Sequence, residues 1–397
     1  MTSKQSELSE LSDQTTHSEQ SLQEEAIDLP PALRWAIRYA GSLFFLSLAW
    51  VPLFNRSRYA DLSNWYTDHL HHAYATWVAL SHGLEIYTRP FAEIRDGTGW
   101  PYPVEAWGEM PGFAYPPGVM VLFLPLTLLG RFAGLSFHAF STVAVLFVLA
   151  IAAWAFHQAV RALLVLPQGS RVASLVITWL MLAQIGLQGF FDAAFIGAGF
   201  AAIVSWRRGK PDVALLWLCA AAFVHFRAAV FAPLGAVVLY RCWQERARIR
   251  HFALKLGLAA AAILLSLASF ALMYPTTEAF RHRSVRVLSN PNALGVVILT
   301  SLLLAAVLLW RRQWLALATQ AIVVGLALVE LQNYWWHGAV VLAVPFVVGA
   351  TRAPLFSGEF SLVRGVWLFW ALAIHAIVWR DPPGQIFIEF VKFLRVT

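Results

Sequence analysis

The feature that most constrains this chain is its series of long apolar runs, several of which are long enough to cross a lipid bilayer. They include 137–160, 172–188, 252–274 and 293–310. A helix needs about 20 apolar residues to span the hydrocarbon core, where every backbone polar group must be satisfied internally. The 397 residues are 59% hydrophobic and 13% charged, whereas soluble proteins average about 25% charged residues. The sequence therefore predicts an all-α polytopic membrane protein with about 11 transmembrane helices.

Positively charged residues set the expected orientation. Residues 1–30 are polar and rich in Ser, Gln and Glu, so we expect a disordered cytoplasmic tail ahead of a single transmembrane domain at 31–397. Arg34 and Arg38 stand at the start of the first expected span, about 35–54, and cytoplasmic loops carry an excess of Arg and Lys. The N-terminus is therefore expected in the cytoplasm, and 55–115 forms a large first extracytoplasmic loop.

Basic loops further along the chain add a constraint on topology. They are expected on the cytoplasmic side and comprise 161–171, 207–210 and 241–255. All three can be inside only if the apolar run 116–130, which is short for a crossing, does not cross completely. The alternative is a full crossing that leaves one basic loop outside. Because the net charge of +7 is concentrated in such loops, it does not indicate a nucleic-acid partner.

Most residues able to carry chemistry gather in the 55–115 loop. Within about a dozen positions it contains Asp61, Asp68, His69, His71 and His72. Apolar residues recur at roughly helical spacing over 62–84, which predicts an amphipathic helix lying on the outer membrane surface. The first extracytoplasmic loop is therefore expected to carry surface helices. Polar residues gathered at the bilayer edge are candidates for a functional site, so we expect the active site here.

The candidate residues fall into three roles. Asp68, with Asp61 as a second candidate, could act as a general base on a hydroxyl group. Arginines suited to holding a lipid-linked phosphate by charge-assisted bonds are Arg227, Arg281, Arg283 and Arg286. The last three occupy an expected outer loop, against the usual charge rule, which makes them more informative than the inner basic loops. Candidates for substrate binding are His72, Tyr115, Asp192 and His337.

The order of features over about 35–260 is typical of one known group. Asp68 precedes a stretch of small residues that ends in Gly83 and Tyr87, and Tyr115-Pro116-Pro117 then opens an apolar segment. A break at 189–192, a basic Trp206–Lys210 loop and a short helical pair around Arg227 follow. This order resembles the polyprenyl-phosphate-sugar-dependent glycosyltransferases of the GT-C superfamily, and is closest to glycosyltransferase family 87, the bacterial α-mannosyltransferase-like membrane proteins.

The resemblance implies a GT-C-like bundle in the plasma (inner) membrane and a hexosyl- or pentosyltransferase activity in building the cell envelope. The donor would be a polyprenyl-phosphate sugar such as mannose, and the acceptor a hydroxyl group on a glycan or glycolipid at the extracytoplasmic side. An aspartate, best matched by Asp68, would deprotonate or orient that hydroxyl. Membrane lipids are the other expected partners. No cofactor is expected, apart from the open possibility of a divalent metal near His69 and His72.

Each assignment has a structural alternative. Asp61 and Asp68 could simply solvate a surface helix, and Asp192 could be a helix N-cap. Arg227 could extend its head group to the membrane surface, while the 281–286 arginines could contact lipid headgroups. His337 lies in a Trp-rich segment that could be an aromatic belt. At the level of function, the alternative classes are a membrane transporter or lipid/sugar flippase, and an inactive scaffold.

Overall fold

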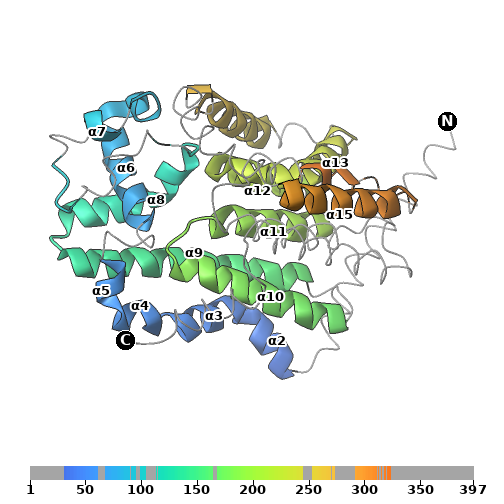
Figure 1. Cartoon of the computed structure of the whole chain (residues 1–397), viewed down its shortest axis with the longest axis horizontal. Helices are drawn as coiled ribbons and strands as arrows, with labels where there is room; N and C mark the ends of the chain where they lie inside the picture. Colours follow the sequence, from blue (N-terminus) through green and yellow to red (C-terminus); the bar gives the residue numbers. More distant parts are fainter. Residues whose placement is uncertain are drawn as a thin grey trace.

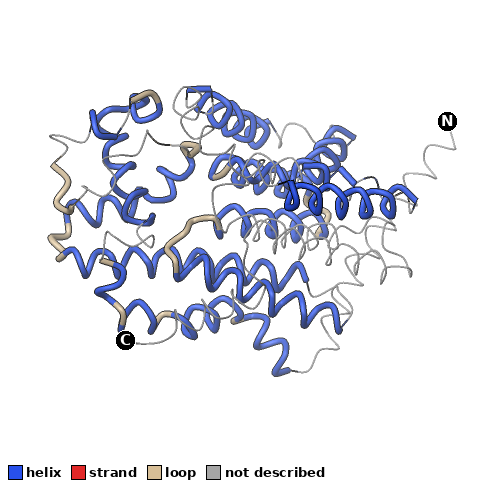
Figure 2. The backbone as a smooth tube through the Cα atoms, viewed as in Figure 1, coloured by secondary structure: helices blue, strands red, loops and turns tan. Residues whose placement is uncertain are grey.

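The computed structural model describes 31–60, 68–89, 91–94, 99–103, 113, 115–163, 168–244, 253–269, 271–272, 291–310 and scattered positions between 312 and 322. Throughout this described part, the regular structure is helical and no strand occurs (Figure 2). The all-α class expected from the apolar runs is therefore confirmed at this level. The expected tail at 1–30 and the last spans, beyond 322, lie outside the described residues.

Four long helices joined by short connections form the centre of the molecule (Figure 1). They are α9 (Phe137–Leu163), α10 (Gln168–Leu187), α11 (Ala193–Arg207) and α12 (Pro211–Val224). Helix α9 packs against both α10 and α11, and α11 packs against α12. The connections α10–α11 and α11–α12 are only a few residues long, so consecutive helices run antiparallel.

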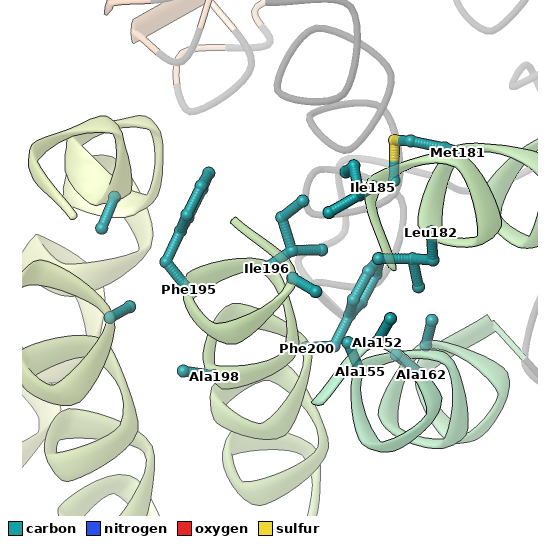
Figure 3. Packing of buried hydrophobic residues seen from close by; sticks show 14 of the residues in the cluster. Ala152, Ala155, Ala162, Met181, Leu182, Ile185, Phe195, Ile196, Ala198 and Phe200 are labelled. Carbon is teal, nitrogen blue, oxygen red and sulfur yellow. The ribbon is translucent and has the colours of Figure 1, made fainter. Parts of the chain in front are cut away.

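Small residues allow these central helices to approach closely (Figure 3). A Cβ at Gly197 would lie 2.4 Å from the Trp154 ring, and a Cβ at Gly186 would lie 2.9 Å from Leu149. Ala152 and Ala155 on α9 are fully buried at the same interfaces. Close contact over long, regular helices gives each buried side chain many dispersion contacts, and this makes the central helices a rigid frame for the residues at their ends.

The N-terminal helices lie along one side of α9 (Figure 1). They are α2 (Pro31–Arg38), α3 (Ala40–Leu48), α4 (Trp50–Phe54) and α5 (Arg56–Tyr59). The expected first span, 35–54, thus corresponds mainly to α3 and α4 together. Phe44 anchors this layer, because it is buried and stacks on Phe156 of α9 with ring centroids 5.0 Å apart.

A second group of helices gathers at one end of the frame. It consists of α6 (Asp68–His82), the 3₁₀-helix η2 (Gly83–Tyr87), α7 (Phe91–Ile94) and α8 (Gly118–Phe132). Helix α6 packs along α8 and also touches α9. Thr127 of α8 donates a hydrogen bond of 2.9 Å to the Ala73 carbonyl, which fixes the two helices side by side.

The expectation of a surface helix over 62–84 is wrong for α6. Residues 69–76 are buried without interruption, whereas a surface helix would bury one face only. The polar members of this run, His69, His71, His72 and Thr76, are enclosed together with the apolar ones. The reason is tertiary: α8, α9, the break before α11, and the side chains of Phe113 and Tyr115 all pack against α6. Only the end of α6, near Leu80, is exposed.

The remaining helices continue from α12. The 3₁₀-helix η4 (Phe226–Phe231) leads directly into α13 (Ala232–Gln244). A helix at Ala253–Ser269 and α15 (Pro291–Trp310) follow. Leucines dominate the exposed positions of these last two helices, among them Leu264, Leu267, Leu299 and Leu302.

Two helices in the described part are long and apolar enough to cross a membrane, namely Phe137–Leu163 and the continuous segment Phe226–Gln244. Seven shorter apolar helices accompany them, including Gly118–Phe132. This last helix has 15 residues, or about 22 Å of rise against a hydrocarbon core of about 30 Å. Its incomplete crossing and the total of about 11 crossings stay predictions.

Candidate functional site

A buried ion pair marks the centre of the candidate site. Asp192 precedes α11, and Arg227 lies in η4, 35 residues further along the chain. Arg227 Nη1 donates to Asp192 Oδ1 over 2.7 Å, and the two side chains are only 9% and 5% exposed. Burying a charge is costly unless it is well paired, so each of these two side chains depends on the other to remain charged inside the protein.

The geometry corrects two structural alternatives raised by the sequence. Asp192 occupies the position before α11, but its backbone is helical and its side chain makes no capping hydrogen bond to the described first turn. Its carboxylate turns instead to Arg227. The Arg227 guanidinium points into the protein and is not extended toward a surface, because Asp192 supplies a closer partner for its charge.

His225 completes this charged group. It ends α12 with an extended backbone, at φ −150° and ψ 134°. Its Nδ1 accepts a hydrogen bond of 3.0 Å from the Arg227 backbone N–H, so the proton of the neutral ring belongs on Nε2. Nε2 lies 3.7 Å from Asp192 Oδ1. The carboxylate oxygen therefore faces a guanidinium on one side and an imidazole N–H on the other.

Aromatic rings connect the charged group to α6. Phe191 stacks on His225 with centroids 5.5 Å apart and meets His72 edge-on at 4.6 Å. Tyr115 contacts the same two histidines, at 5.7 Å and 5.0 Å. Four segments that are distant in sequence thus converge on one cluster of side chains, which we call the His72–Arg227 cluster: His72, Tyr115, Phe191, Asp192, His225 and Arg227.

His72 has an unusual environment for a polar side chain. It is 1% exposed, and rings of Phe113, Tyr115, Phe123 and Phe191 surround it at centroid distances between 4.6 and 6.1 Å. Neither ring nitrogen has a hydrogen-bond partner among the described residues. Burial, together with His71 and His69, lowers the pKa of His72 well below its ordinary value, so the ring is neutral at pH 7.

His69 and His71, in the same buried part of α6, are also neutral. Burial lowers the pKa of His69 to about 3 and that of His71 to about 4. His69 Nε2 lies 3.4 Å from the hydroxyl of Ser141 on α9, whose hydroxyl hydrogen-bonds to the Tyr59 carbonyl. These contacts hold the first turn of α6 against the frame.

Two glycines bring the segments of the site together. Gly189 has φ +79°, which glycine adopts without strain, and a Cβ there would lie 2.3 Å from His69 Nδ1. The break before α11 can therefore approach α6 only with glycine at this position. A Cβ at Gly118 would lie 2.3 Å from the Phe223 carbonyl oxygen. The start of α8 is consequently held against the end of α12, which places Tyr115 beside His225.

The structure unites four of the residues that the sequence singled out: His72, Tyr115, Asp192 and Arg227. Asp68 is the first residue of α6, but its carboxylate lies outside the described part. The positions of Asp61, Arg281, Arg283, Arg286 and His337 also fall outside the described residues. Their proposed roles as base, phosphate ligands and substrate ligand stay predictions.

His225 and Phe191 are site residues that the sequence reading did not select. A signal for His225 was present, because it is a polar residue that interrupts two apolar runs and stands two positions from Arg227. Phe191 gave no comparable signal, since phenylalanine is common throughout the chain. Its importance comes from the turn that places it between two histidines.

The arrangement can bind an anion and exclude water. Arginine offers a planar, permanently charged fork that matches phosphate or carboxylate oxygens, and the enclosing rings lower the local dielectric, which strengthens such a bond. In the described part of the chain, no group of three or more His, Cys, Asp or Glu side chains is placed to hold a metal ion. Comparison with known proteins found no matching family model, no matching curated protein and no matching solved structure.

Proposed function

We propose that this protein is an integral membrane glycosyltransferase that moves a sugar from a polyprenyl-phosphate donor to a hydroxyl acceptor on the extracytoplasmic side. The observation that carries the proposal is the His72–Arg227 cluster. It joins the segment after Asp68, the Tyr115-Pro116-Pro117 segment, the 189–192 break and Arg227. These are the features whose order in the sequence resembles the GT-C glycosyltransferases.

The cluster has the components that such a reaction needs. Arg227 is suited to a donor phosphate, whose negative charge grows as the bond to the sugar breaks. Asp192 and His225 hold the Arg227 segment in place, and the rings of Tyr115 and Phe191 offer apolar faces to a sugar. We assign to Asp68 the role of general base, which takes the proton of the acceptor hydroxyl. Asp68 is the first residue of α6, the helix that also carries His72. The hydroxyl oxygen attacks the anomeric carbon with inversion, and the polyprenyl phosphate leaves with the bonding electrons.

A membrane location is supported by the outer surface of the described helices. The exposed faces of Ala253–Ser269 and α15 carry mostly leucine side chains, more than half of whose surface is exposed in several cases. Large contiguous apolar surfaces are rare on monomeric soluble proteins, but lipid tails accommodate them.

The proposal is tested by sugar transfer with the purified full chain in lipid nanodiscs, using a panel of polyprenyl-phosphate sugars. We expect Asp68→Asn to lower the transfer rate by about a hundredfold, as loss of a general base does, and Asp61→Asn to lower it less. Arg227→Gln should raise the donor KM. Asp212→Asn, at the opposite end of α12, is the matched control with unchanged activity. Full activity in the Asp61/Asp68 double variant would overturn this function.

A transporter is the second candidate, and one observation favours it. The helix ends at 188–192 and 225–231 meet through a buried ion pair, and ionisable residues enclosed in this way mark substrate pathways in transporters. Liposomes loaded with labelled polyprenyl-phosphate sugar separate the two functions. Movement of the intact lipid between leaflets without sugar transfer would favour the transporter.

A further inference from the structure

Arg131, in the last turn of α8, has a setting that the proposed reaction does not explain. Its guanidinium carbon lies 5.3 Å from the centre of the Trp77 ring and 5.6 Å from that of the Phe132 ring. Within the described residues, neither a carboxylate nor a hydrogen-bond acceptor pairs with this guanidinium, and Nε is buried without a partner. Among the described residues, the partners of this permanent positive charge are thus aromatic rings.

A second unsatisfied donor lies in the same cluster. Trp100 contacts Trp77 with ring centroids 6.4 Å apart, and its indole Nε1 is buried without a hydrogen-bond partner in the described part. The preceding residue, Gly99, lies close to Arg131, because a Cβ built there would be 3.5 Å from Nη2. Buried N–H groups are rarely left unpaired in proteins. Two buried donors that have no acceptor in the described part of the chain indicate a ligand that supplies oxygen atoms and negative charge.

The surroundings indicate the kind of molecule that carries this anion. Phe132, which contacts the guanidinium, is 70% exposed, and Leu80, three residues after Trp77 on α6, is 59% exposed, so exposed apolar side chains neighbour the aromatic partners of Arg131. Tryptophan and arginine beside exposed apolar side chains are typical of the level of lipid headgroups. A favourable interaction with the helix dipole would be enough to explain a cation in the last turn of α8. It does not explain the buried, unpaired N–H of Trp100.

We propose that Arg131, Trp77, Trp100 and Phe132 form a binding site for the phosphate group of a lipid, separate from the His72–Arg227 cluster. The guanidinium and the indole N–H bind the phosphate oxygens, while Phe132 and Leu80 contact the lipid chains. The inference rests on the membrane location in the proposed function and not on sugar transfer. Site and cluster lie at opposite ends of α8, since Arg131 is in its last turn and Tyr115 precedes its first.

Native mass spectrometry of the full chain in neutral detergent tests the site. Phosphatidylglycerol, a polyprenyl monophosphate and zwitterionic phosphatidylcholine are added separately. We expect wild type to retain one phosphate-bearing anionic lipid, and Arg131→Gln to weaken retention about tenfold, as loss of a charge-assisted bond does. Arg131→Lys should recover part of the affinity. Trp100→Phe keeps the ring but removes the donor, and it should weaken retention severalfold.

Arg89→Gln is the matched control, because it removes the same charge from an exposed arginine that is paired with Glu85 and Glu93. Retention in this variant should equal that of wild type. Equal retention in Arg131→Gln and Arg89→Gln would overturn the site, and so would displacement of the lipid by millimolar inorganic phosphate, which would identify a free-anion site. Thermal melting of each variant shows that it is folded. Lipid retention is measured without any sugar transfer. A failure of the transferase proposal can therefore be distinguished from a failure of this lipid site.

Discussion

The two ends of α11 are built alike but have different surroundings. The turn before α11 and the turn after it contain the same helix-ending motif, in which two successive N–H groups return to the last turn of the preceding helix. Gly189 and Phe190 donate to the carbonyls of residues 186 and 185 over 3.2 and 3.0 Å, and Gly209 and Lys210 donate to those of 206 and 205 over 3.0 and 3.1 Å. Both glycines have positive φ, of 79° and 66°. The first turn is buried against α6, whereas the second faces open space.

The charged residues at the two ends of α11 also differ in burial. The open turn carries Arg208 and Lys210, which are exposed, and the nearby pair Asp212–Lys255 has side chains that are 19% and 39% exposed. The buried turn carries Asp192, paired with Arg227. Exposed charges at a helix end stabilise the helix modestly and fix orientation in a membrane, while a buried pair has to be retained at a desolvation cost. Burial, more than residue type, therefore separates a candidate site from a basic loop.

The largest loss of stability is expected from breaking the buried ion pair, compared with breaking the partly exposed one. Asp192→Ala leaves the Arg227 charge buried and unpaired, which should lower the free energy of unfolding by about 3–5 kcal/mol. Asp212→Ala breaks a pair that solvent partly screens and should cost about 0–1 kcal/mol. Thermal unfolding in the same detergent measures both. Equal losses would mean that the two pairs do not differ in burial as described.

Acidification is expected to weaken the buried end selectively. The unfolded chain protonates its histidines near pH 6.5, whereas His69 and His71 in the folded protein do so only near pH 3 and 4. Between these values the unfolded state binds more protons, so stability falls as the pH falls. The loss is about 1.4 kcal/mol per histidine for each pH unit below 6.5.

Melting temperatures between pH 7.5 and 5, and hydrogen exchange of α6 peptides over the same range, measure this loss. His69→Gln should flatten the dependence, because it removes one of the two buried imidazoles whose pKa is lowered. A pH profile that His69→Gln does not alter would contradict the buried neutral state of this ring.

The smallest effect is the difference in unfolding free energy between two turn-glycine variants. Gly189→Ala and Gly209→Ala both place an alanine at positive φ, which costs about 1–2 kcal/mol. Only Gly189→Ala also forces a methyl group against the His69 ring, and overpacking of this kind adds about 1–3 kcal/mol. The difference between the two variants in unfolding free energy isolates the contact between the turn and α6. No difference would show that the turn can move away from α6 freely.

The sequence determined the helical class and the positions of the central helices. The expected runs 137–160 and 172–188 correspond to α9 and α10, and the expected break at 189–192 separates α10 from α11. Local composition indicated both the basic residues at 207–210 and the helix break at 189–192. Such features depend on neighbouring residues in the chain, through apolar run length and the conformational freedom of glycine. A sequence therefore carries them directly.

The tertiary structure alone decided which polar groups meet. Asp192, expected to bind substrate or to cap a helix, is the partner of Arg227. Helix α6, expected on the membrane surface, is enclosed together with His69, His71 and His72. The pairing spans 35 residues, and the burial of α6 depends on where α8 and the 189–192 turn are packed. These outcomes follow from how helices lie against one another at close-packed interfaces. Local periodicity contains no information about that arrangement. For this reason His225 and Phe191 could be recognised as site residues only from the tertiary structure.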